Sequence, residues 1–321
     1  MKKLLAILLA TMLVLAMAGS AMAEGGTRKV FFTNAFYTAP FCDPLNNAAT
    51  AYAQENGVEL TIVDGQGDAS VQLDQIKTAI DQGYDGIIYF PADAEGSITI
   101  VNTLNESGIP YAIIDSRVDA SVADTIYGFA GPDNIQMGEA GGQACVDLLG
   151  EEGGKVVCMM GAAGTDPATN RQQGFVNIVS QHDNIEIIYA ENVEGWDTAI
   201  AMSQMQDVIT RFGDDYDFIW CHDDGIYQGV HQALEAAGID EAESGIISVG
   251  TGCNAAGVAG IRGGYHYGDV LHSAKEEGQL GVQLCIDAMD GKVKPGDAVW
   301  YKCSSPLVTI ENVDEFDGIG W

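Results

Sequence analysis

The stretch Lys155–Phe175, which reads Lys-Val-Val-Cys-Met-Met-Gly-Ala-Ala-Gly-Thr-Asp-Pro-Ala-Thr-Asn-Arg-Gln-Gln-Gly-Phe, decides the fold class. Its apolar start is typical of a short buried strand. The glycines that follow allow a sharp turn, Thr165 or Asp166 supplies a helix cap, and Pro167 suits a first helical turn. A strand, a turn and a capped helix place the turn at the carboxyl end of a parallel sheet, where open α/β sheets bind ligands.

Arg171 lies about one turn into that helix. Helical side chains lean toward the helix N-terminus, so its guanidinium should reach back over the glycine turn. We interpret Arg171 as the anchor of a small polar ligand in a cleft. From this stretch alone, a surface arginine on an ordinary helix is an equal alternative.

The same unit recurs along the chain, with short apolar runs alternating with amphipathic stretches that end at a glycine, as at Gly57, Gly83 and Gly108. Repeated strand–helix units predict parallel sheets with helices on both faces. A second series begins at Asp133, without a long linker, so the sequence predicts an α/β protein of two similar lobes. The predicted strands are 29–32, 59–63, 86–90, 111–114, 155–159, 185–189, 218–221, 245–249 and 267–271.

The N-terminus has the layout of a secretory signal peptide. Lys2 and Lys3 precede an apolar run from Leu4 to Ala18, and the small residues 19–23 predict cleavage after Ala23. The run is short for a membrane span, which needs about 20 apolar residues. No cysteine stands at the cleavage region to carry a lipid anchor. We therefore expect an exported, periplasmic protein that is not embedded in the membrane.

Charge and cysteine content exclude several classes of protein. Residues 1–23 hold two of the 14 basic residues and no acid, so residues 24–321 carry 12 basic against 46 acidic side chains, a net charge of −34. Such a chain is repelled by nucleic acid and by anionic membranes, which argues against a transcriptional regulator. The seven cysteines are odd in number and form no C-x-x-C pair, so a disulfide framework is not expected.

Polar and aromatic side chains follow several predicted strands, where they should face a cleft between the lobes. Aromatic rings stack on the C–H faces of a sugar, and carboxylates and arginine bind its hydroxyls. The candidates are Phe41, Asp115, Ser116, Arg171, Trp196, Asp223 and His272. Each also has a structural alternative, because the aromatics could be core, the aspartates caps and the histidine a local hydrogen-bonding group.

The sequence favours binding over catalysis. Asp115 and Asp223 could serve as the carboxylate pair of a glycosidase. Motifs of serine hydrolases, zinc proteases, P-loop enzymes and dinucleotide-binding enzymes are absent. The run Cys221–Asp224 contains metal-ligand types, but adjacent residues of a strand point to opposite faces. We therefore expect no enzyme activity, no metal and no cofactor.

From about Arg28 to Val313 the chain resembles the periplasmic solute-binding proteins of sugar ABC transporters, of the ribose-binding type with two Rossmann-like lobes. The resemblance covers nearly all of the chain after the leader. It is carried by Pro40-Phe41, Phe90-Pro91-Ala92-Asp93, Ile114-Asp115-Ser116, Gly164-Thr165 through Arg171-x-x-Gly174-Phe175, Trp196-Asp197, His222-Asp223-Asp224, Val249-Gly250 and Val308–Phe316.

The resemblance implies a three-stranded hinge with crossings near 130–132, 272–274 and 302–305. It implies an N-terminal lobe of 24–131 plus 273–303 and a C-terminal lobe of 132–272 plus 304–321. It also implies ligand contacts by the seven candidate residues, and a monomer that delivers a monosaccharide or similar ligand to a permease with its ATPase. We expect Arg171→Ala or Asp223→Ala to abolish binding and to leave the fold intact.

Four departures from the ribose-binding pattern leave the ligand open. Phe90 stands where those proteins have asparagine, Thr251 where they have an aspartate that holds sugar hydroxyls, His272 in place of glutamine, and Cys42 in place of a second aromatic residue. A pentose, a hexose, a polyol or a related signal molecule all remain possible ligands. The alternatives in function are a sensor that feeds a chemoreceptor or sensor kinase, and a binder of a non-sugar solute.

Overall fold

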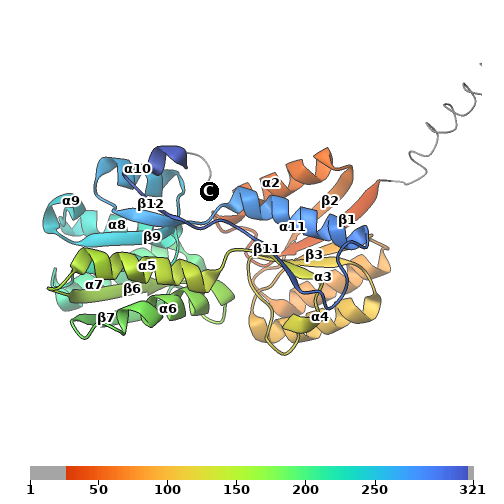
Figure 1. Ribbon diagram of the computed structural model, residues 1–321, viewed down its shortest axis with the longest axis horizontal. Coiled ribbons are helices and arrows are strands. Elements are labelled where there is room, and N and C mark those ends of the chain that lie inside the picture. Colours follow the sequence, from red (N-terminus) through yellow and green to blue (C-terminus); the bar gives the residue numbers. More distant parts are fainter. Residues whose placement is uncertain (1–26, 317–321) are drawn as a thin grey trace, which may run out of the picture.

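The structure, a computed structural model, describes residues 27–316. The predicted leader, residues 1–23, lies outside the described residues. Two lobes stand side by side in Figure 1, each built on a six-stranded sheet with helices on both faces. The predicted α/β fold class is therefore confirmed.

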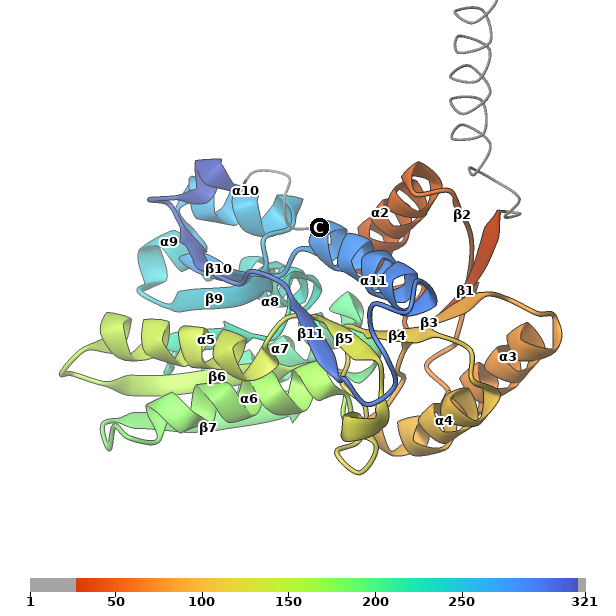
Figure 2. The same ribbon diagram turned by 45° about the vertical axis from the view of Figure 1, so that its right-hand side comes forward.

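The first sheet has the strand order β2-β1-β3-β4-β5-β11, and all its pairs are parallel. Figures 1 and 2 show α2 and α11 on one face of this sheet and α3 and α4 on the other. The strands are β1 (Arg28–Asn34), β2 (Val58–Asp64), β3 (Gly86–Phe90), β4 (Tyr111–Ile114), β5 (Gly128–Gly131) and β11 (Val299–Lys302). The helices are α2 (Cys42–Glu55), α3 (Ala69–Asp81), α4 (Ala94–Ser107) and α11 (Ala274–Met289), with the 3-10 turn η1 (Ala123–Thr125) before β5.

The second sheet repeats this order as β7-β6-β8-β9-β10-β12, and its last strand alone runs antiparallel to its neighbour. The strands are β6 (Gly154–Met160), β7 (Ile185–Asn192), β8 (Phe218–Cys221), β9 (Ile247–Gly252), β10 (Gly268–Leu271) and β12 (Leu307–Thr309). The helices are α5 (Asn134–Leu149), α6 (Asp166–Val179), α7 (Thr198–Phe212), α8 (Asp224–Ala237), α9 (Glu241–Ser244) and α10 (Ala255–Gly263), with the 3-10 turns η2 (Glu194–Trp196) and η3 (Val313–Glu315).

The strand in the stretch 155–175 is buried on both faces of its sheet. Val156 and Cys158 pack into a cluster with residues of α5 and α6, and Val157 and Met159 pack into a separate cluster with residues of α7 and α8. Because successive strand side chains point to opposite faces, a continuous apolar run is what a doubly covered strand requires. All seven cysteines lie among the described residues as buried free thiols.

The chain passes between the two sheets three times. β5 leads into α5, β10 leads into α11, and β11 leads into β12, so each connection joins an element of one lobe to an element of the other. We call these three connections the hinge. Figure 1 shows the consequence for α11, which belongs late in the sequence but lies on the first lobe beside α2.

Some elements differ from the sequence prediction. Strand β5, Gly-Phe-Ala-Gly, was not predicted because it lacks an apolar run. It is a strand because its backbone pairs with β4 on one side and β11 on the other. In both sheets the direction of strand order reverses at the second strand, between β1 and β3 and between β6 and β8. This reversal point is where α/β sheets bind ligands, outside the carboxyl ends of the strands.

Helix α6, which carries Arg171, packs against α5 at unusually short range. A Cβ atom built on Gly138 would lie 2.0 Å from the backbone oxygen of Arg171, and one on Gly174 would lie 2.1 Å from the backbone oxygen of Ile135. No side chain fits between the two helices at these points. The two glycines therefore fix how deeply α6, and with it Arg171, sits against the rest of the lobe.

The close helix pair predicts that Gly138→Ala destabilises the protein, by about 1–3 kcal/mol, because a methyl group there forces the helices apart. Chemical denaturation measures the change. Gly225→Ala is the matched control, since a Cβ there has no neighbour closer than 3.5 Å. Equal stability of both variants would contradict this view of the α5–α6 contact.

Candidate functional site

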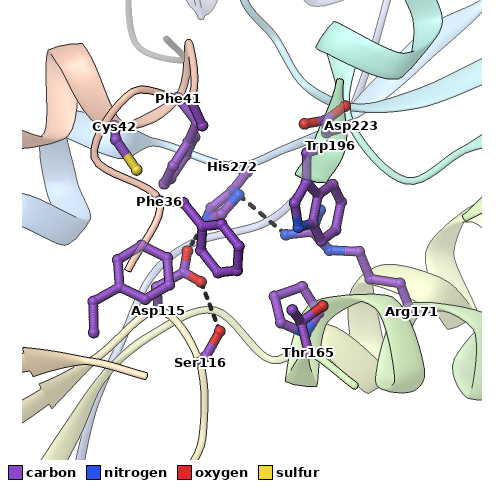
Figure 3. A pocket seen from close by; sticks show the side chains of 13 residues that line it. Phe36, Phe41, Cys42, Asp115, Ser116, Thr165, Arg171, Trp196, Asp223 and His272 are labelled. Atoms are coloured by element: carbon purple, nitrogen blue, oxygen red, sulfur yellow. Dashed lines mark hydrogen bonds and ion pairs between the residues drawn. The ribbon is translucent and has the colours of Figure 1, made fainter. Parts of the chain in front are cut away.

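A cavity lies between the lobes, at the carboxyl ends of strands from both sheets (Figure 3). All seven residues predicted from the sequence line it: Phe41, Asp115, Ser116, Arg171, Trp196, Asp223 and His272. Six further residues complete its wall, namely Phe36, Ala39, Cys42, Phe90, Thr165 and Pro167. The structure thus brings together residues that are up to 236 positions apart in the chain, 36 and 272.

The first lobe contributes Asp115 directly after β4, with a backbone φ of 62°. This left-handed conformation is uncommon outside glycine but tolerated by aspartate, and it turns the side chain into the cavity. Ser116 Oγ donates a hydrogen bond to Asp115 Oδ1 at 3.1 Å. Phe41 stands at the start of α2, and its ring stacks on the His272 ring with centroids 4.2 Å apart.

The second lobe contributes Trp196 and Asp223. Trp196 also has a left-handed backbone, with φ of 58°, which is a rarer and more strained state for a bulky residue. Its ring lies directly on Gly161, where an added Cβ would be 1.9 Å from Trp196 Cη2. Asp223 caps α8, since the Ile226 N–H donates to its Oδ1 at 2.7 Å. Asp223 is therefore both a helix cap, which was its structural alternative, and a residue of the cavity wall.

Arg171 is 2 % exposed, and its guanidinium is held by three groups. Its Nε donates to Asn134 Oδ1 at 3.0 Å, one Nη donates to the His222 backbone oxygen, and the other donates to His272 Nδ1 at 3.1 Å. The alternative of a surface arginine is thus wrong. A guanidinium has five N–H groups, so two remain for a ligand. Figure 3 shows the group between Trp196 and His272.

The contact with Arg171 determines the protonation of His272. Arginine has no acceptor, so His272 Nδ1 must accept, and the imidazole proton must sit on Nε2. His272 Nε2 accordingly donates to Glu277 Oε2 at 2.8 Å. Burial and the positive charge of Arg171 lower the pKa of His272 well below its usual value. His272 is therefore a neutral link between Arg171 and Glu277, with both ring nitrogens occupied.

Asp115, His272 and Glu277 form the one group of three or more metal-ligand side chains within reach of a common ion among residues 27–316, with ligand atoms within 4.8 Å of each other. A metal needs the lone pair of His272 Nε2, and this atom carries the proton as long as Arg171 donates to Nδ1. The arrangement therefore fits a hydrogen-bonded network and not a cation. We call Asn134, Arg171, His272, Glu277 and Asp115 the hinge network.

Burial raises the pKa of the acidic groups around the cavity. The pKa of Asp115 rises to about 6, an effect that Arg171 partly offsets, and the pKa of Asp223 also rises to about 6. Burial and the neighbouring Asp115 raise the pKa of Glu277 well above its usual range. These carboxyl groups therefore take up protons at a higher pH than exposed carboxyl groups do.

Three residues that shape the site were missed in the sequence. Asn134 Oδ1 accepts from Arg171 while its Nδ2 donates to Asp166 at 2.7 Å. Glu277 had a detectable signal, because it lies on the buried face of α11 with Ala274 and Gly281, where a charge is unexpected. Phe36 lies in the loop after β1, and its sequence context carries no comparable signal.

One wall of the cavity is apolar. Phe36 and Phe90 meet edge to face with centroids 5.7 Å apart, and Ala39 and Cys42 extend this surface on the first lobe. The polar side chains, among them Asp115, Arg171 and Asp223, line other parts of the cavity. A ligand that fills it must present hydroxyls or similar groups on one side and an edge of C–H groups on the other.

Residues 30–293 match the family model described as the periplasmic binding protein domain. The chain is 25 % identical over 297 residues to a xylitol-binding protein of Mycolicibacterium smegmatis, which covers 92 % of this chain and 81 % of the relative. It is 25 % identical over 253 residues to a ribose import binding protein of Bacillus subtilis, covering 79 % of each chain.

Solved structures agree with these relatives. An ABC transporter solute-binding protein of Bacillus halodurans with bound myo-inositol matches with a TM-score of 0.83 at 25 % identity, covering 92 % of this chain and 99 % of the other. One from Mycobacterium smegmatis with bound glycerol matches with a TM-score of 0.81 at 27 % identity, covering 91 % and 98 %.

The chain belongs to the periplasmic binding protein family. The resemblance stated from its motifs is confirmed. The two relatives named above are both binding proteins. Among residues 27–316, no helix has both the length and the hydrophobicity of a membrane span.

The close contact between Trp196 and Gly161 predicts that Gly161→Ala weakens ligand binding by at least tenfold, because the added methyl group pushes the indole out of the cavity wall. Gly164→Ala is the control, since Gly164 has φ of +81° but no atom near its added Cβ. That change strains the backbone without touching Trp196. Calorimetric titration of both variants measures the difference, and normal binding by Gly161→Ala would refute the placement of the indole.

The burial of Arg171 revises one expectation from the sequence. Arg171→Ala leaves the His222 carbonyl and the Asp115–Glu277 pair without their cation, so we now expect a loss of about 3–5 kcal/mol in folding stability beside the loss of binding. Asp223→Asn is the cleaner test of the cavity, because asparagine caps a helix as well as aspartate does. If ligand-free Arg171→Ala unfolds at the same temperature as the unmodified protein, that result would contradict the hinge network.

Proposed function

We propose that this protein is the solute-binding component of an ABC importer, which captures a small sugar or polyol between its lobes and delivers it to a membrane permease with an ATPase. The observation that carries the proposal is the convergence of aromatic, acidic and arginine side chains from both lobes on one cavity. A ligand held there contacts both lobes at once, so binding favours the closed arrangement. A permease distinguishes the closed from the open form by the surfaces that closure brings together.

The ligand class follows from the cavity wall. Two free N–H groups of Arg171 and the carboxyls of Asp115 and Asp223 suit hydroxyl groups, and charged partners make the stronger hydrogen bonds. Phe41 and Trp196 suit the C–H faces of a ring. The names of the relatives, with xylitol, ribose, myo-inositol and glycerol, support a polyhydroxylated ligand.

The apolar wall around Phe36 and Phe90 narrows this class. A hydroxyl group placed against it loses its hydrogen bonds to water without replacement, which costs about 1–3 kcal/mol. A ligand with a deoxy or methyl position at this edge avoids the cost. We therefore infer that the preferred ligand is a sugar or polyol with one hydroxyl-free edge, and not ribose.

The lobe boundaries that we propose are 24–131 plus 273–303 for the N-terminal lobe and 132–272 plus 304–321 for the C-terminal lobe. The three hinge connections described above support this division. The predicted leader and the family support a periplasmic location. We further infer a monomer. We also infer a protein without enzyme activity, which is supported by the names of its relatives as binding proteins.

The direct test is thermal unfolding of residues 24–321 with a panel of pentoses, hexoses, polyols and their deoxy analogues. A ligand at about 100 times its Kd adds about 2.7 kcal/mol to the stability of the folded state, which shifts the transition visibly. We expect the largest shift from a deoxy or methylated sugar or polyol, and a much smaller one with Asp223→Asn. A shift with an amino acid or nucleoside alone would contradict the ligand class. No shift with any compound would contradict binding itself.

Ligand affinity should fall as the pH drops below about 6. The free protein has Asp115 and Asp223 with pKa values raised to about 6 by burial. Ligand hydroxyls donate to the ionised carboxylates and so lower these pKa values in the complex. The complex then binds fewer protons, and by linkage the association constant rises with pH until the free groups are ionised.

Calorimetric titrations at about pH 5 and about pH 8 measure this dependence. They should show proton release on binding near the lower pH and little at the higher one. Asp223→Asn should reduce the dependence, since one of the two titrating carboxyls is gone. An affinity that does not change with pH in the unmodified protein would contradict direct hydroxyl–carboxylate contacts.

A further inference from the structure

A chain of hydrogen-bonded polar side chains lies inside the second lobe, outside the ligand cavity. It starts at the half-buried His231 and runs inward through side chains that are all buried. They come from α8, α9, β9, β10 and the turn before β10, all of which belong to the second lobe (Figure 1). In order, the members are His231, Glu241, Ser248, His266, Asp269 and Asp224, and none of them lines the cavity.

The outer part of this chain fixes the direction of its hydrogen bonds. Glu241 meets His231 Nδ1 at one oxygen, at 2.5 Å, and Ser248 Oγ at the other, at 3.1 Å. Ser248 Oγ also lies 2.8 Å from His266 Nδ1. A hydroxyl has one proton and a carboxylate can only accept. Ser248 therefore donates to Glu241 and accepts a hydrogen bond from His266 Nδ1.

Asp269 must then carry a proton of its own. Burial lowers the pKa of His266 to about 4, so its ring is neutral and has a single proton, on Nδ1. His266 Nε2 is therefore an acceptor, and it lies 2.9 Å from Asp269 Oδ1. Only a protonated Asp269 can donate a hydrogen bond there.

Asp224, at the inner end, needs a second proton. Its Oδ2 accepts from the Asn254 N–H. The carboxyl groups of Asp224 and Asp269 contact each other, and Asp224 Oδ1 and Asp269 Oδ2 have no other partner among the described residues. Because the Asp269 proton faces His266, the proton between the two carboxyl groups comes from Asp224. Burial raises the pKa of both groups, and the proximity of Asp269 raises that of Asp224 further.

The backbone closes on this pair from two sides. A Cβ atom added to Gly250 would lie 2.4 Å from Asp269 Oδ1, and one added to Gly257 would lie 2.3 Å from Asp269 Oδ2 and 2.9 Å from Asp224 Oδ2. Asp224, Asp269 and His266 do not bring three ligand atoms within reach of one ion. The enclosure therefore fits two acids that bond each other, and not a metal.

The other ionisable groups that face the pair are neutral. They are Cys221 of β8, Cys253 after β9 and Tyr227 of α8, whose ring also stacks on His266 with centroids 3.8 Å apart. Burial raises the pKa of all three. None of them balances a negative charge on the pair, which is a further reason for the pair to keep its protons.

We propose that Asp224 and Asp269 form a pair of protonated carboxylic acids that positions Asp223 for the ligand. Asp224 is the first residue of α8 and follows Asp223 directly, and its bond to Asn254 ties this turn to the loop after β9. Asp223 caps the same helix and lines the cavity. The neutral pair also places no second negative charge beside the carboxyl group that binds ligand hydroxyls. The protonation of the pair is independent of the proposed function, whereas its effect on ligand binding rests on it.

The position of the His266 proton tests the chain without any ligand. ¹⁵N NMR of the histidine side chains reports which ring nitrogen carries the proton, and we expect Nδ1 for His266. Assignment uses His266→Gln, or elimination among the five histidines if this variant does not fold. A proton on His266 Nε2 would overturn the proposal, because Nε2 would then donate to an ionised Asp269.

The pH dependence of stability tests the protons of the pair. An unfolded aspartate loses its proton at about pH 4, whereas the folded pair keeps its protons above that pH. Folding therefore takes up protons, and the stability of the unmodified protein falls as the pH rises. Asp269→Asn offers a donor and an acceptor without a proton to lose. Its folding equilibrium constant, relative to the unmodified protein, should rise at least about tenfold from about pH 5 to about pH 8.

Asp81→Asn, at an exposed position on α3, is the control and should show no such rise. A merely structural role of Asp269 would change stability equally at both pH values. That result for Asp269→Asn would overturn the proposal.

The positioning of Asp223 is tested through the Ile226 amide, which donates to its Oδ1 at 2.7 Å. Hydrogen exchange of this amide should be unchanged in Asp269→Asn and at least about tenfold faster in Asp269→Ala, or in Asp269→Ser if the alanine variant does not fold. The Gly96 amide, which donates to the cap Asp93 at 2.6 Å in the first lobe, is the internal control. Unchanged Ile226 exchange in the alanine or serine variant would overturn the positioning role.

Ligand affinity should follow the same order. For the panel compound with the largest thermal shift, Asp269→Asn should bind within about twofold of the unmodified protein, and Asp269→Ala at least about tenfold more weakly. Normal binding by Asp269→Ala would also overturn the positioning role. If the unmodified protein binds no panel compound, the proposed function fails while the NMR and exchange results still decide the pair, so the two failures are distinguishable.

Discussion

The buried charge of Arg171 is the constraint on which the hinge and the ligand cavity both depend. A guanidinium out of contact with water is costly unless its hydrogen bonds and its charge are balanced. The balance here comes from Asn134 after the first crossing, from His272 in the second crossing, and through His272 from Glu277 on α11. One side chain of the second lobe thereby organises residues of both lobes at the hinge.

The same balance leaves the cavity ready for a ligand. Arg171 keeps two N–H groups, Asp115 and Asp223 keep carboxyl groups with raised pKa values, and both pocket residues Asp115 and Trp196 have left-handed backbones. Strained conformations persist where the surrounding structure holds them, as Gly161 does for the indole. Buried charge and backbone strain both lower the stability of the fold, and here both occur at the cavity between the lobes.

Much of the fold and of the site could be predicted from the sequence. Phe41, Arg171 and Asp223 were found because the carboxyl ends of parallel strands lie along one edge of a sheet, so the position after an apolar run predicts a place in space. Strand β5 could not be found, because it is a strand only through its neighbours β4 and β11.

The hinge network could not be predicted for a related reason. Glu277 and Asn134 act through contacts between elements that are far apart in sequence, and hydrogen bonds of this kind leave no local pattern. His272 was predicted as a ligand contact, but only the structure shows that Arg171 and Glu277 occupy both its ring nitrogens. Its ring also stacks on Phe41, and both residues line the cavity.

The protonation of His272 tests this account most directly. ¹⁵N NMR of the histidine side chains, assigned with His272→Gln, reports which ring nitrogen carries the proton. The account predicts a neutral His272 with the proton on Nε2 and a pKa well below the usual range of histidine, because the residue is buried and Arg171 donates to Nδ1 and opposes a second proton. A proton on Nδ1, or titration of His272 in the ordinary range of histidine, would contradict the hinge network.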